Sequence, residues 1–196
     1  MTTLILPPSD TPFGTARDIL ANGGIIAVPT ETVYGLAVNA DNPTAKSALY
    51  ALKGRGFDKP FTIHLASTDK IPDLAIVNDT AQVIITKFLP GALTLILPDK
   101  QGGTVGIRVP YSPIFAALAA HCPFPLAVTS ANLSGQPDTK SATDVYNIFN
   151  TRIPVIIDGG ALHGTPSTIV RIDGDNISVL RQGIVTEAEL RAAIHG

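Results

Sequence analysis

The sequence has a single cysteine, Cys122, among its 196 residues. One cysteine excludes an internal disulfide and fits a reducing compartment. No apolar run approaches the roughly 18 residues of a membrane span. The first residues also lack the basic region of a signal peptide. We therefore expect a cytoplasmic protein with no membrane association. The net charge of −2 gives the surface as a whole no attraction for nucleic acid, so any anion site must be local.

Common nucleotide and metal motifs are also missing. The sequence contains neither G-x-x-x-x-G-K-[ST] nor G-x-G-x-x-G, which excludes ordinary P-loop or Rossmann nucleotide binding. No group of cysteines and histidines has the spacing of a structural zinc site, and we expect no metal held tightly by protein ligands.

Apolar strands and amphipathic helices alternate along the chain. Several predicted strands adjoin through short turns rather than helical crossovers, which favours a mixed sheet over an all-parallel one. The length and the 45% hydrophobic content suffice for one sizeable core. The sequence therefore predicts an α/β (α+β) fold in one domain over residues 1–196, with a mixed sheet and helices packed on it. Strands are predicted at 24–29, 36–40, 61–66, 93–97, 104–109, 125–129, 154–157, 167–172 and 176–181.

Two polar loops follow buried strands. The first, within residues 28–36, carries Thr30, Glu31 and Thr32 directly after an apolar strand, and the second is the serine-rich segment 129–135. Open α/β sheets place ligands at such strand ends, and hydroxyl groups with a glycine turn can form an anion site. Plain turn chemistry explains the same residue types equally well.

The basic residues are unevenly distributed. Four of the fourteen lysines and arginines stand within residues 46–59, at Lys46, Lys53, Arg55 and Lys59. Flanking glycines let the backbone approach a ligand, and arginine and lysine suit phosphate oxygens. The alternative is a solvated helix end whose cations complement the helix dipole.

Arg108 stands within an alternating strand. In residues 104–109 the valines and the isoleucine form one apolar face, and Arg108 shares the other face with Thr104 and Gly106. The small glycine keeps that face open, so we expect Arg108 to line a pocket rather than to lie on an outer solvated face. His64 lies on the polar face of its own strand, where a structural histidine and a general base are both possible.

Seven motifs along the chain occur in this order in one family. They are P-T-E-T-V-Y-G-L at 29–36, K-x-R-x-x-x-K-P at 53–60, P-G-x-L-T-L-I-L at 90–97, V-G-I-R-V-P at 105–110, S-A-N-L-S-G at 130–135, S-T-I-V at 167–170 and L-R-Q-G at 180–183. Together they make the chain resemble the YrdC-type family of threonylcarbamoyl-AMP synthases, in its short, single-domain form.

The resemblance implies a twisted sheet around a positively lined cavity and a specific reaction. L-threonine, bicarbonate and ATP would give threonylcarbamoyl-AMP and pyrophosphate, with Mg²⁺ held largely by phosphates and water. A separate transferase complex would then pass the threonylcarbamoyl group to tRNAs that read codons beginning with A. Two alternatives stay open: an RNA-binding or ribosome-maturation factor that holds tRNA or double-stranded RNA weakly, and a divergent nucleotide-binding paralogue.

Residue roles follow from the same resemblance. Residues implied in catalysis are Lys53, Arg55, Lys59 and Arg108. Residues implied in binding threonine or its carbamate are Thr30, His64, Arg108 and Thr168. Residues implied in binding ATP are Arg55, Lys59, Thr104, Ser130, Asn132 and Arg181.

Four positions depart from the family pattern: Gly56, Tyr111, Asp138 and Pro166. Asp138 takes a position near the nucleotide that is often small and hydroxylated in the family. An acid beside phosphates is unfavourable unless it turns away from them.

Overall fold

The structure, a computed structural model, describes residues 2–195, and its main feature is one twisted ten-stranded sheet. The strand order is β1-β8-β2-β3-β7-β4-β6-β5-β9-β10. The strands are β1 (Leu4–Leu6), β2 (Ile26–Pro29), β3 (Tyr34–Asn39), β4 (Thr62–His64), β5 (Leu93–Pro98), β6 (Thr104–Arg108), β7 (Leu126–Ser130), β8 (Val155–Ile157), β9 (Thr168–Asp173) and β10 (Asn176–Arg181).

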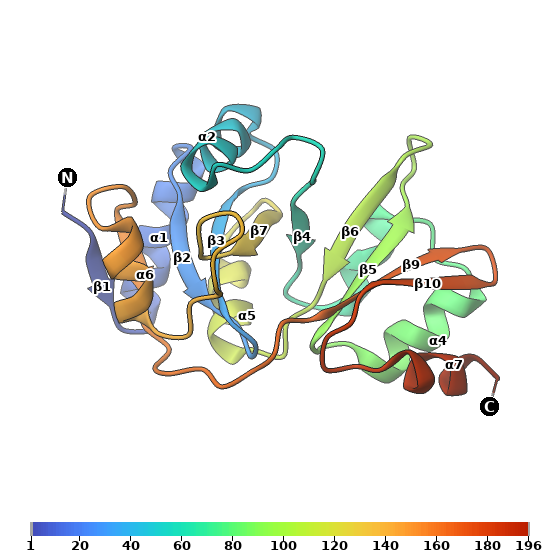
Figure 1. The fold of residues 1–196 in the computed structure, drawn as a ribbon. Helices are drawn as coiled ribbons and strands as arrows, with labels where there is room; N and C mark the ends of the chain where they lie inside the picture. The colour runs from blue at the N-terminus through green and yellow to red at the C-terminus, as the bar shows by residue number, and fades with distance from the viewer. Residues whose placement is uncertain (1, 196) are drawn as a thin grey trace.

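Helices pack on this sheet, and the chain ends lie at opposite ends of the molecule (Figure 1). The helices are α1 (Asp10–Ala21), α2 (Pro43–Lys53), α3 (Ile71–Leu74), α4 (Asp79–Phe88), α5 (Pro113–His121), α6 (Ala142–Phe149), α7 (Glu187–His195) and the 3₁₀-helix η1 (Thr68–Lys70). Within residues 2–195, no helix has the length and apolar character needed to cross a membrane.

The sheet is mixed, as the sequence predicts. Parallel pairs join β1 to β8, β2 to β8, β4 to β6 and β5 to β9, and the remaining pairs are antiparallel. All nine predicted strands are present with ends shifted by a few residues. Strand β1 and the short helices at 68–74 are not predicted from the sequence, because segments of three or four residues are too short to show a periodic apolar pattern.

Helices cover both faces of the half of the sheet formed by β2, β3, β7 and β8. On one face, α1 and α5 bury Phe13, Leu20 and Phe115 in a core cluster. On the other, α2 and α6 bury Leu49 and Phe149. Successive β2 residues alternate between these two clusters, as a strand buried on both faces requires.

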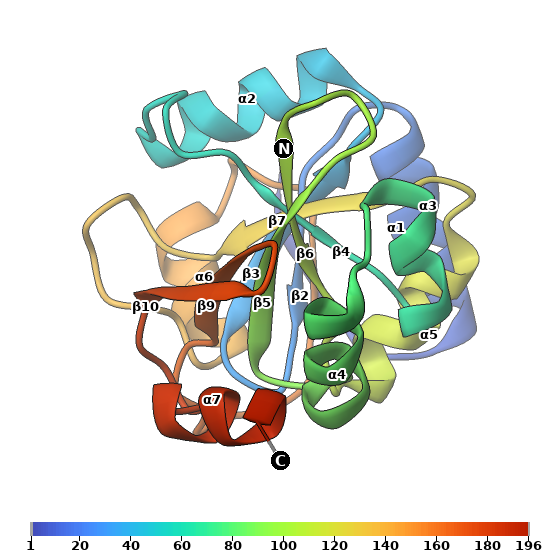
Figure 2. The same cartoon turned by 90° about the vertical axis from the view of Figure 1, so that its right-hand side faces the viewer.

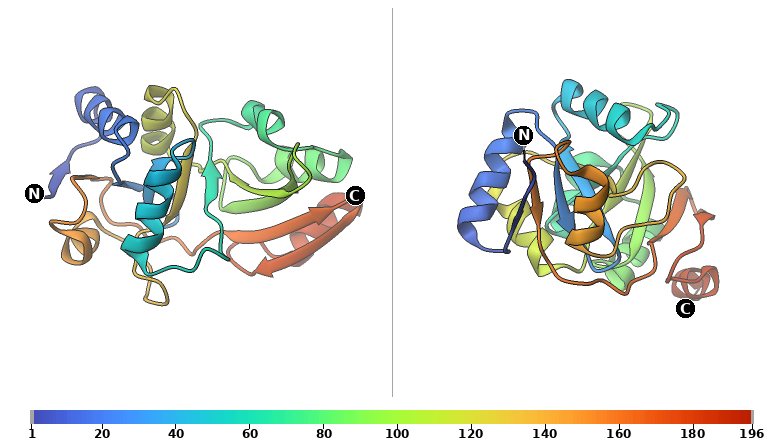
Figure 3. Two further views of the ribbon diagram at one scale, coloured as in Figure 1. Left: turned by 90° about the horizontal axis from the view of Figure 1, so that it is seen from above. Right: turned by 60° about the vertical axis from the view of Figure 1, so that its left-hand side comes forward.

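The other half of the sheet has α3, α4 and α7 on one face (Figure 2). Leu95, Ile107 and Val170 of the central strands point into this core and are fully buried. Because side chains alternate along a strand, the neighbouring residues Thr94 and Arg108 point to the opposite face. Viewed from above, the two halves lie side by side, and β4, which pairs with β7 of the first half and β6 of the second, stands between them (Figure 3).

Helix α2 ends at Lys53, which belongs to the basic segment and is buried. Its N-cap Asn42 accepts a hydrogen bond from the Ala45 amide at 3.0 Å, and Gly54 ends it in the left-handed conformation with φ of 61°. Leu49 and Lys53 are four residues apart, so they lie on the same buried face of the helix. The spacing that places Leu49 in the core thus directs Lys53 inward.

Candidate active site

A pocket lies between the two halves of the sheet, on the face of β5, β6 and β9 opposite α4. Residues from the β2–β3 turn, the loop after α2, β4, β7 and β10 complete its wall. The lining residues are Thr30, Thr32, Val33, Tyr34, Gly35, Arg55, Pro60, Phe61, Thr62, His64, Thr94, Arg108, Val128, Thr129, Ser130, Asp138, Pro166, Ser167, Ile169 and Arg181.

The polar loop after β2 is both a self-capped turn and a pocket wall. Pro29 pairs with Tyr34, so residues 30–33 close a tight hairpin. The Thr30 hydroxyl donates to the Val33 carbonyl at 2.8 Å and lies 3.0 Å from the Thr32 hydroxyl. The turn chemistry drawn from the sequence is therefore confirmed, and it fixes hydroxyl groups that face the pocket.

Arg108 lines the pocket, as expected from its alternation, and it is also held by an acid. Its Nη2 lies 2.9 Å from Glu31 Oε1, and the two side chains are only 6% and 19% exposed. The same Nη2 donates to the Thr32 hydroxyl at 2.9 Å, and Nε donates to the Gly91 carbonyl at 3.4 Å. The Glu31 contact is an ion pair without hydrogen-bond geometry, since neither Glu31 oxygen has a hydrogen-bond partner among the described residues.

His64 stands beside Arg108 because β4 and β6 pair in parallel with these two residues in register. Its ring packs against Phe115 with centroids 5.6 Å apart, and its Nδ1 lies 3.4 Å from the Thr62 carbonyl oxygen. Burial, reinforced by the charge of Arg108, lowers the pKa of His64 to about 3. The imidazole is therefore neutral at physiological pH and suits hydrogen bonding better than accepting a proton.

The other cations of the site are held mainly by backbone carbonyl groups. Arg181 donates to the Ser167 carbonyl at 2.8 and 3.1 Å, and Arg55 donates to the Lys59 carbonyl at 2.9 Å. Burial lowers the pKa of both guanidinium groups, although arginine stays charged in proteins. Carbonyl dipoles orient these cations without neutralising them, so their charge remains available to an anion.

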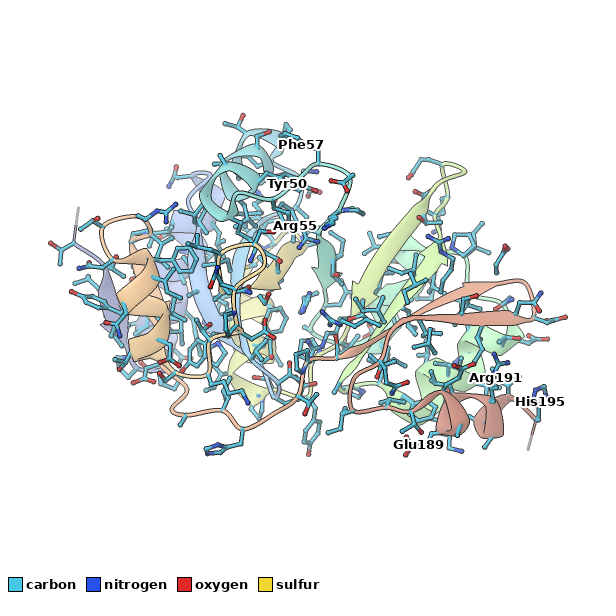
Figure 4. All side chains as sticks on the ribbon, viewed as in Figure 1. Tyr50, Arg55, Phe57, Glu189, Arg191 and His195 are labelled. Atoms are coloured by element: carbon cyan, nitrogen blue, oxygen red, sulfur yellow. The ribbon has the colours of Figure 1, made fainter. Side chains whose placement is uncertain are left out.

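The loop that carries Arg55 is braced by aromatic rings (Figure 4). Tyr50 of α2 stacks on Phe61 with centroids 4.1 Å apart and contacts Phe57 at 4.6 Å. The Arg55 guanidinium lies 5.6 Å from the centre of the Phe61 ring. These contacts keep Arg55 at the pocket wall, although the loop itself is largely exposed.

Lys53 lies behind the pocket wall and fastens the S-A-N segment. Its Nζ donates to the carbonyl oxygens of Ser130 and Asn132, the second at 2.6 Å, and to Asn132 Oδ1 at 3.2 Å. Burial first, and then the charge of Arg55, lowers the pKa of Lys53 to about 8, while Asp138 opposes the shift. Lys53 thus positions Ser130 at the pocket.

The structure brings most of the implied site residues together. The lining contains Thr30, Arg55, His64, Arg108, Ser130 and Arg181. Lys53, Asn132 and Thr168 lie behind it, and Thr168 donates to the Val185 carbonyl at 2.6 Å. Lys59 and Thr104 are exposed and are not among the lining residues.

Several lining residues are not predicted from the sequence. Thr94 and Ser167 both line the pocket, and their hydroxyl groups lie 3.0 Å apart. Thr94 alternates with two buried leucines, the same signal that singled out Arg108, so the pattern was available. Glu31 was noted only as a polar loop residue, because no sequence pattern reveals an ion pair between residues 77 positions apart in the chain.

The pocket offers few protein ligands to a metal ion. Within residues 2–195 there is no group of three or more histidine, cysteine, aspartate or glutamate side chains that could hold a metal. Asp138 is the one carboxylate in the described lining. Mg²⁺ commonly takes one or two carboxylates, with water and substrate phosphates as its other ligands.

Comparisons with known proteins agree with this geometry. The model of the Sua5/YciO/YrdC family, described as telomere recombination, matches residues 18–183. The chain is 37% identical over 177 residues to a putative threonylcarbamoyl-AMP synthase of Methanocaldococcus jannaschii, with 86% of this chain and 84% of the relative covered. The chain belongs to the Sua5/YciO/YrdC family.

Longer members of the Sua5/YciO/YrdC family match as well. The threonylcarbamoyl-AMP synthase of Bacillus subtilis is 37% identical over 201 residues, covering 96% of this chain and 58% of the relative. The Pyrococcus abyssi Sua5 structure complexed with L-threonine superposes with a TM-score of 0.92 at 33% identity, covering 98% of this chain and 61% of that one. This family member thus spans about three fifths of the length of these relatives.

Proposed function

We propose that this protein makes threonylcarbamoyl-AMP from L-threonine, bicarbonate and ATP, with release of pyrophosphate. The observation that carries the proposal is a single pocket lined by Arg55, Arg108 and Arg181, in which carbonyl groups hold Arg55 and Arg181 and leave their charge free for anions. The relatives named threonylcarbamoyl-AMP synthases and the Sua5 structure with L-threonine support this substrate set.

The reaction needs positioning and charge stabilisation rather than a protein nucleophile. The threonine amine and bicarbonate form a carbamate with loss of water, and a carbamate oxygen then attacks the α-phosphorus. The bond from that phosphorus to the bridging oxygen breaks, and pyrophosphate leaves with the electron pair. Arg55, Arg181 and Ser130 would hold the phosphates, with Lys53 and Asn132 fixing the Ser130 segment. Mg²⁺, when bound with ATP, neutralises phosphate charge.

The other end of the pocket would hold threonine. Arg108 can accept the carboxylate of the amino acid or its carbamate, because a guanidinium binds such groups through a planar pair of donors. Thr30 and neutral His64 offer hydrogen bonds to the substrate hydroxyl. Thr168 would act through its neighbour Ser167, since its own hydroxyl is engaged by Val185.

Lys59 and Thr104 would extend the ATP site outside the pocket, where both are exposed. The product would serve a separate transferase complex that modifies tRNAs reading codons beginning with A. A cytoplasmic location would fit this chemistry.

The test is pyrophosphate release from ATP with threonine and bicarbonate omitted in turn. We expect release only when both are present. Release that does not depend on threonine would contradict the proposal and favour the divergent nucleotide-binding paralogue. If RNA binding were the main role, RNA affinity would fall steeply with salt because counterion release weakens, and no threonine-dependent release would occur.

A further inference from the structure

Asp138 has an unusual place in the pocket. It is the one acidic residue in the described lining, and both Arg55 and Arg181 line the same pocket. Within residues 2–195 its carboxylate forms no ion pair with either arginine, since the recorded ion pairs involve other acids. A free carboxylate therefore faces a site whose cations suit phosphates.

The backbone beneath Asp138 is firmly held. Its neighbour Thr139 donates through its hydroxyl to the Ala131 carbonyl at 2.9 Å and accepts from the Tyr34 amide at 3.1 Å. The Asn132 side chain donates to the Gln136 carbonyl in the same loop. These bonds tie the loop to β3 and to the S-A-N segment, so the Asp138 backbone cannot easily move away from the pocket.

The charge of Asp138 acts on the phosphate-binding cations. It raises the pKa of Lys53 and of Arg181 and so opposes the effect of burial on both. The same negative charge repels a bare triphosphate placed against these cations. The repulsion becomes an attraction when a divalent cation lies between the carboxylate and the phosphates.

We propose that Asp138 supplies a carboxylate oxygen, directly or through one water, to the divalent cation that accompanies the nucleotide. The pocket would thereby select magnesium-bound ATP over free ATP. This inference rests on the proposed function, since it requires ATP in this pocket. It agrees with the preference of Mg²⁺ for one or two carboxylates beside substrate phosphates.

The test compares ATP affinity with and without the metal. Calorimetry measures the Kd of ATP in excess Mg²⁺ and in a chelator, for the wild type and for Asp138→Asn. The asparagine keeps the shape and removes the charge. We expect Asp138→Asn to bind free ATP more tightly and magnesium-bound ATP more weakly than the wild type does. The Kd in chelator divided by the Kd in Mg²⁺ should therefore fall by roughly tenfold.

Asp58→Asn is the matched control. Asp58 also acts electrostatically on Arg55, but it lies on the exposed loop and not in the pocket lining. We expect this variant to shift both Kd values in the same direction and to leave their ratio unchanged.

The outcomes separate the two proposals. Failure of the wild type to bind ATP under either condition would refute the proposed function. ATP binding with an unchanged Kd ratio in Asp138→Asn would refute the role of Asp138 alone. Equal weakening of both forms would also overturn it, because that result indicates a contact with the ribose or base. Denaturant unfolding of each variant verifies that the fold is retained.

Discussion

Replacing Arg108 by methionine removes one partner of a buried ion pair. Arg108 Nη2 lies 2.9 Å from Glu31 Oε1, and the Arg108 side chain is 6% exposed. Leaving a buried charge without its partner typically costs about 3–5 kcal/mol. Both carboxylate oxygens of Glu31 are buried although 19% of its side chain is exposed, so water does not screen the abandoned charge, and we expect Arg108→Met to lower the free energy of unfolding by at least about 3 kcal/mol.

Glu31→Gln separates the structural from the functional role of Arg108. If the stability lost in Arg108→Met comes from the unpaired Glu31 carboxylate, the double variant Arg108→Met/Glu31→Gln should recover much of that stability. The double-mutant cycle built from these two substitutions should then give a coupling energy of about 1–3 kcal/mol. Urea unfolding without ligands at neutral pH measures each corner of the cycle. Calorimetry with threonine then asks whether the recovered double variant binds the amino acid, which we expect it not to do.

Two results would refute this reasoning. Arg108→Met that unfolds at the same urea concentration as the wild type would show that the ion pair contributes nothing to stability. A stable double variant that still binds threonine with unchanged affinity would remove Arg108 from the substrate site. Arg108→Lys gives a further check, since it keeps the charge but loses the planar fork and should bind threonine more weakly.

Three other expectations can be measured directly. Arg55→Ala with Lys59→Ala should weaken ATP binding by about 1.5–3 kcal/mol per lost contact without unfolding the protein, and unchanged affinity in calorimetry would exclude both residues. Serine should be a poorer substrate than threonine, and valine should be far worse. Valine lacks the hydroxyl, so it would leave buried polar groups of the pocket unpaired. Comparable turnover of valine and threonine would contradict that pocket. The pKa of His64 is about 3 in the folded state and 6.5 in the unfolded chain. Only the unfolded chain takes up the proton between these values, so folding stability is lost as pH falls below 6.5. Between pH 7.5 and 5 this loss should be about 2 kcal/mol, and it should disappear in His64→Asn.

Local patterns predicted most of the fold correctly. The alternation in residues 104–109 identified both the strand and the face that carries Arg108. The T-x-x-E pattern of Thr186 and Glu189 forms a capping box at the start of α7, where the Thr186 amide donates to Glu189 at 2.7 Å and the Glu189 amide donates to the Thr186 hydroxyl at 3.2 Å. These features depend on residues close in sequence, so the sequence alone specifies them.

Features that depend on distant contacts escaped the sequence analysis. Strand β1 exists because Leu4–Leu6 pairs with Val155–Ile157, and three residues alone carry no signal of that pairing. Lys53 was expected in the cation cluster but not as a buried anchor of residues 130–132, nearly eighty positions away. The alternation placed Arg108 in a pocket, and its pairing with Glu31 makes it part of the framework as well.

The pocket cations are held in two different ways, and the difference fits the proposed ligands. Lys53, Arg55 and Arg181 bind mainly neutral carbonyl groups, so these contacts leave their positive charge in place, as a site for a polyanionic nucleotide requires. Arg108 is already paired with Glu31, and its Nη2 and Nε donate to Thr32 and Gly91, so the charge around Arg108 is more nearly balanced. A nearly balanced site suits an amino acid, which carries both a carboxylate and an amine. We therefore expect the arrangement of charge to favour the nucleotide at Arg55 and Arg181 and threonine beside Arg108.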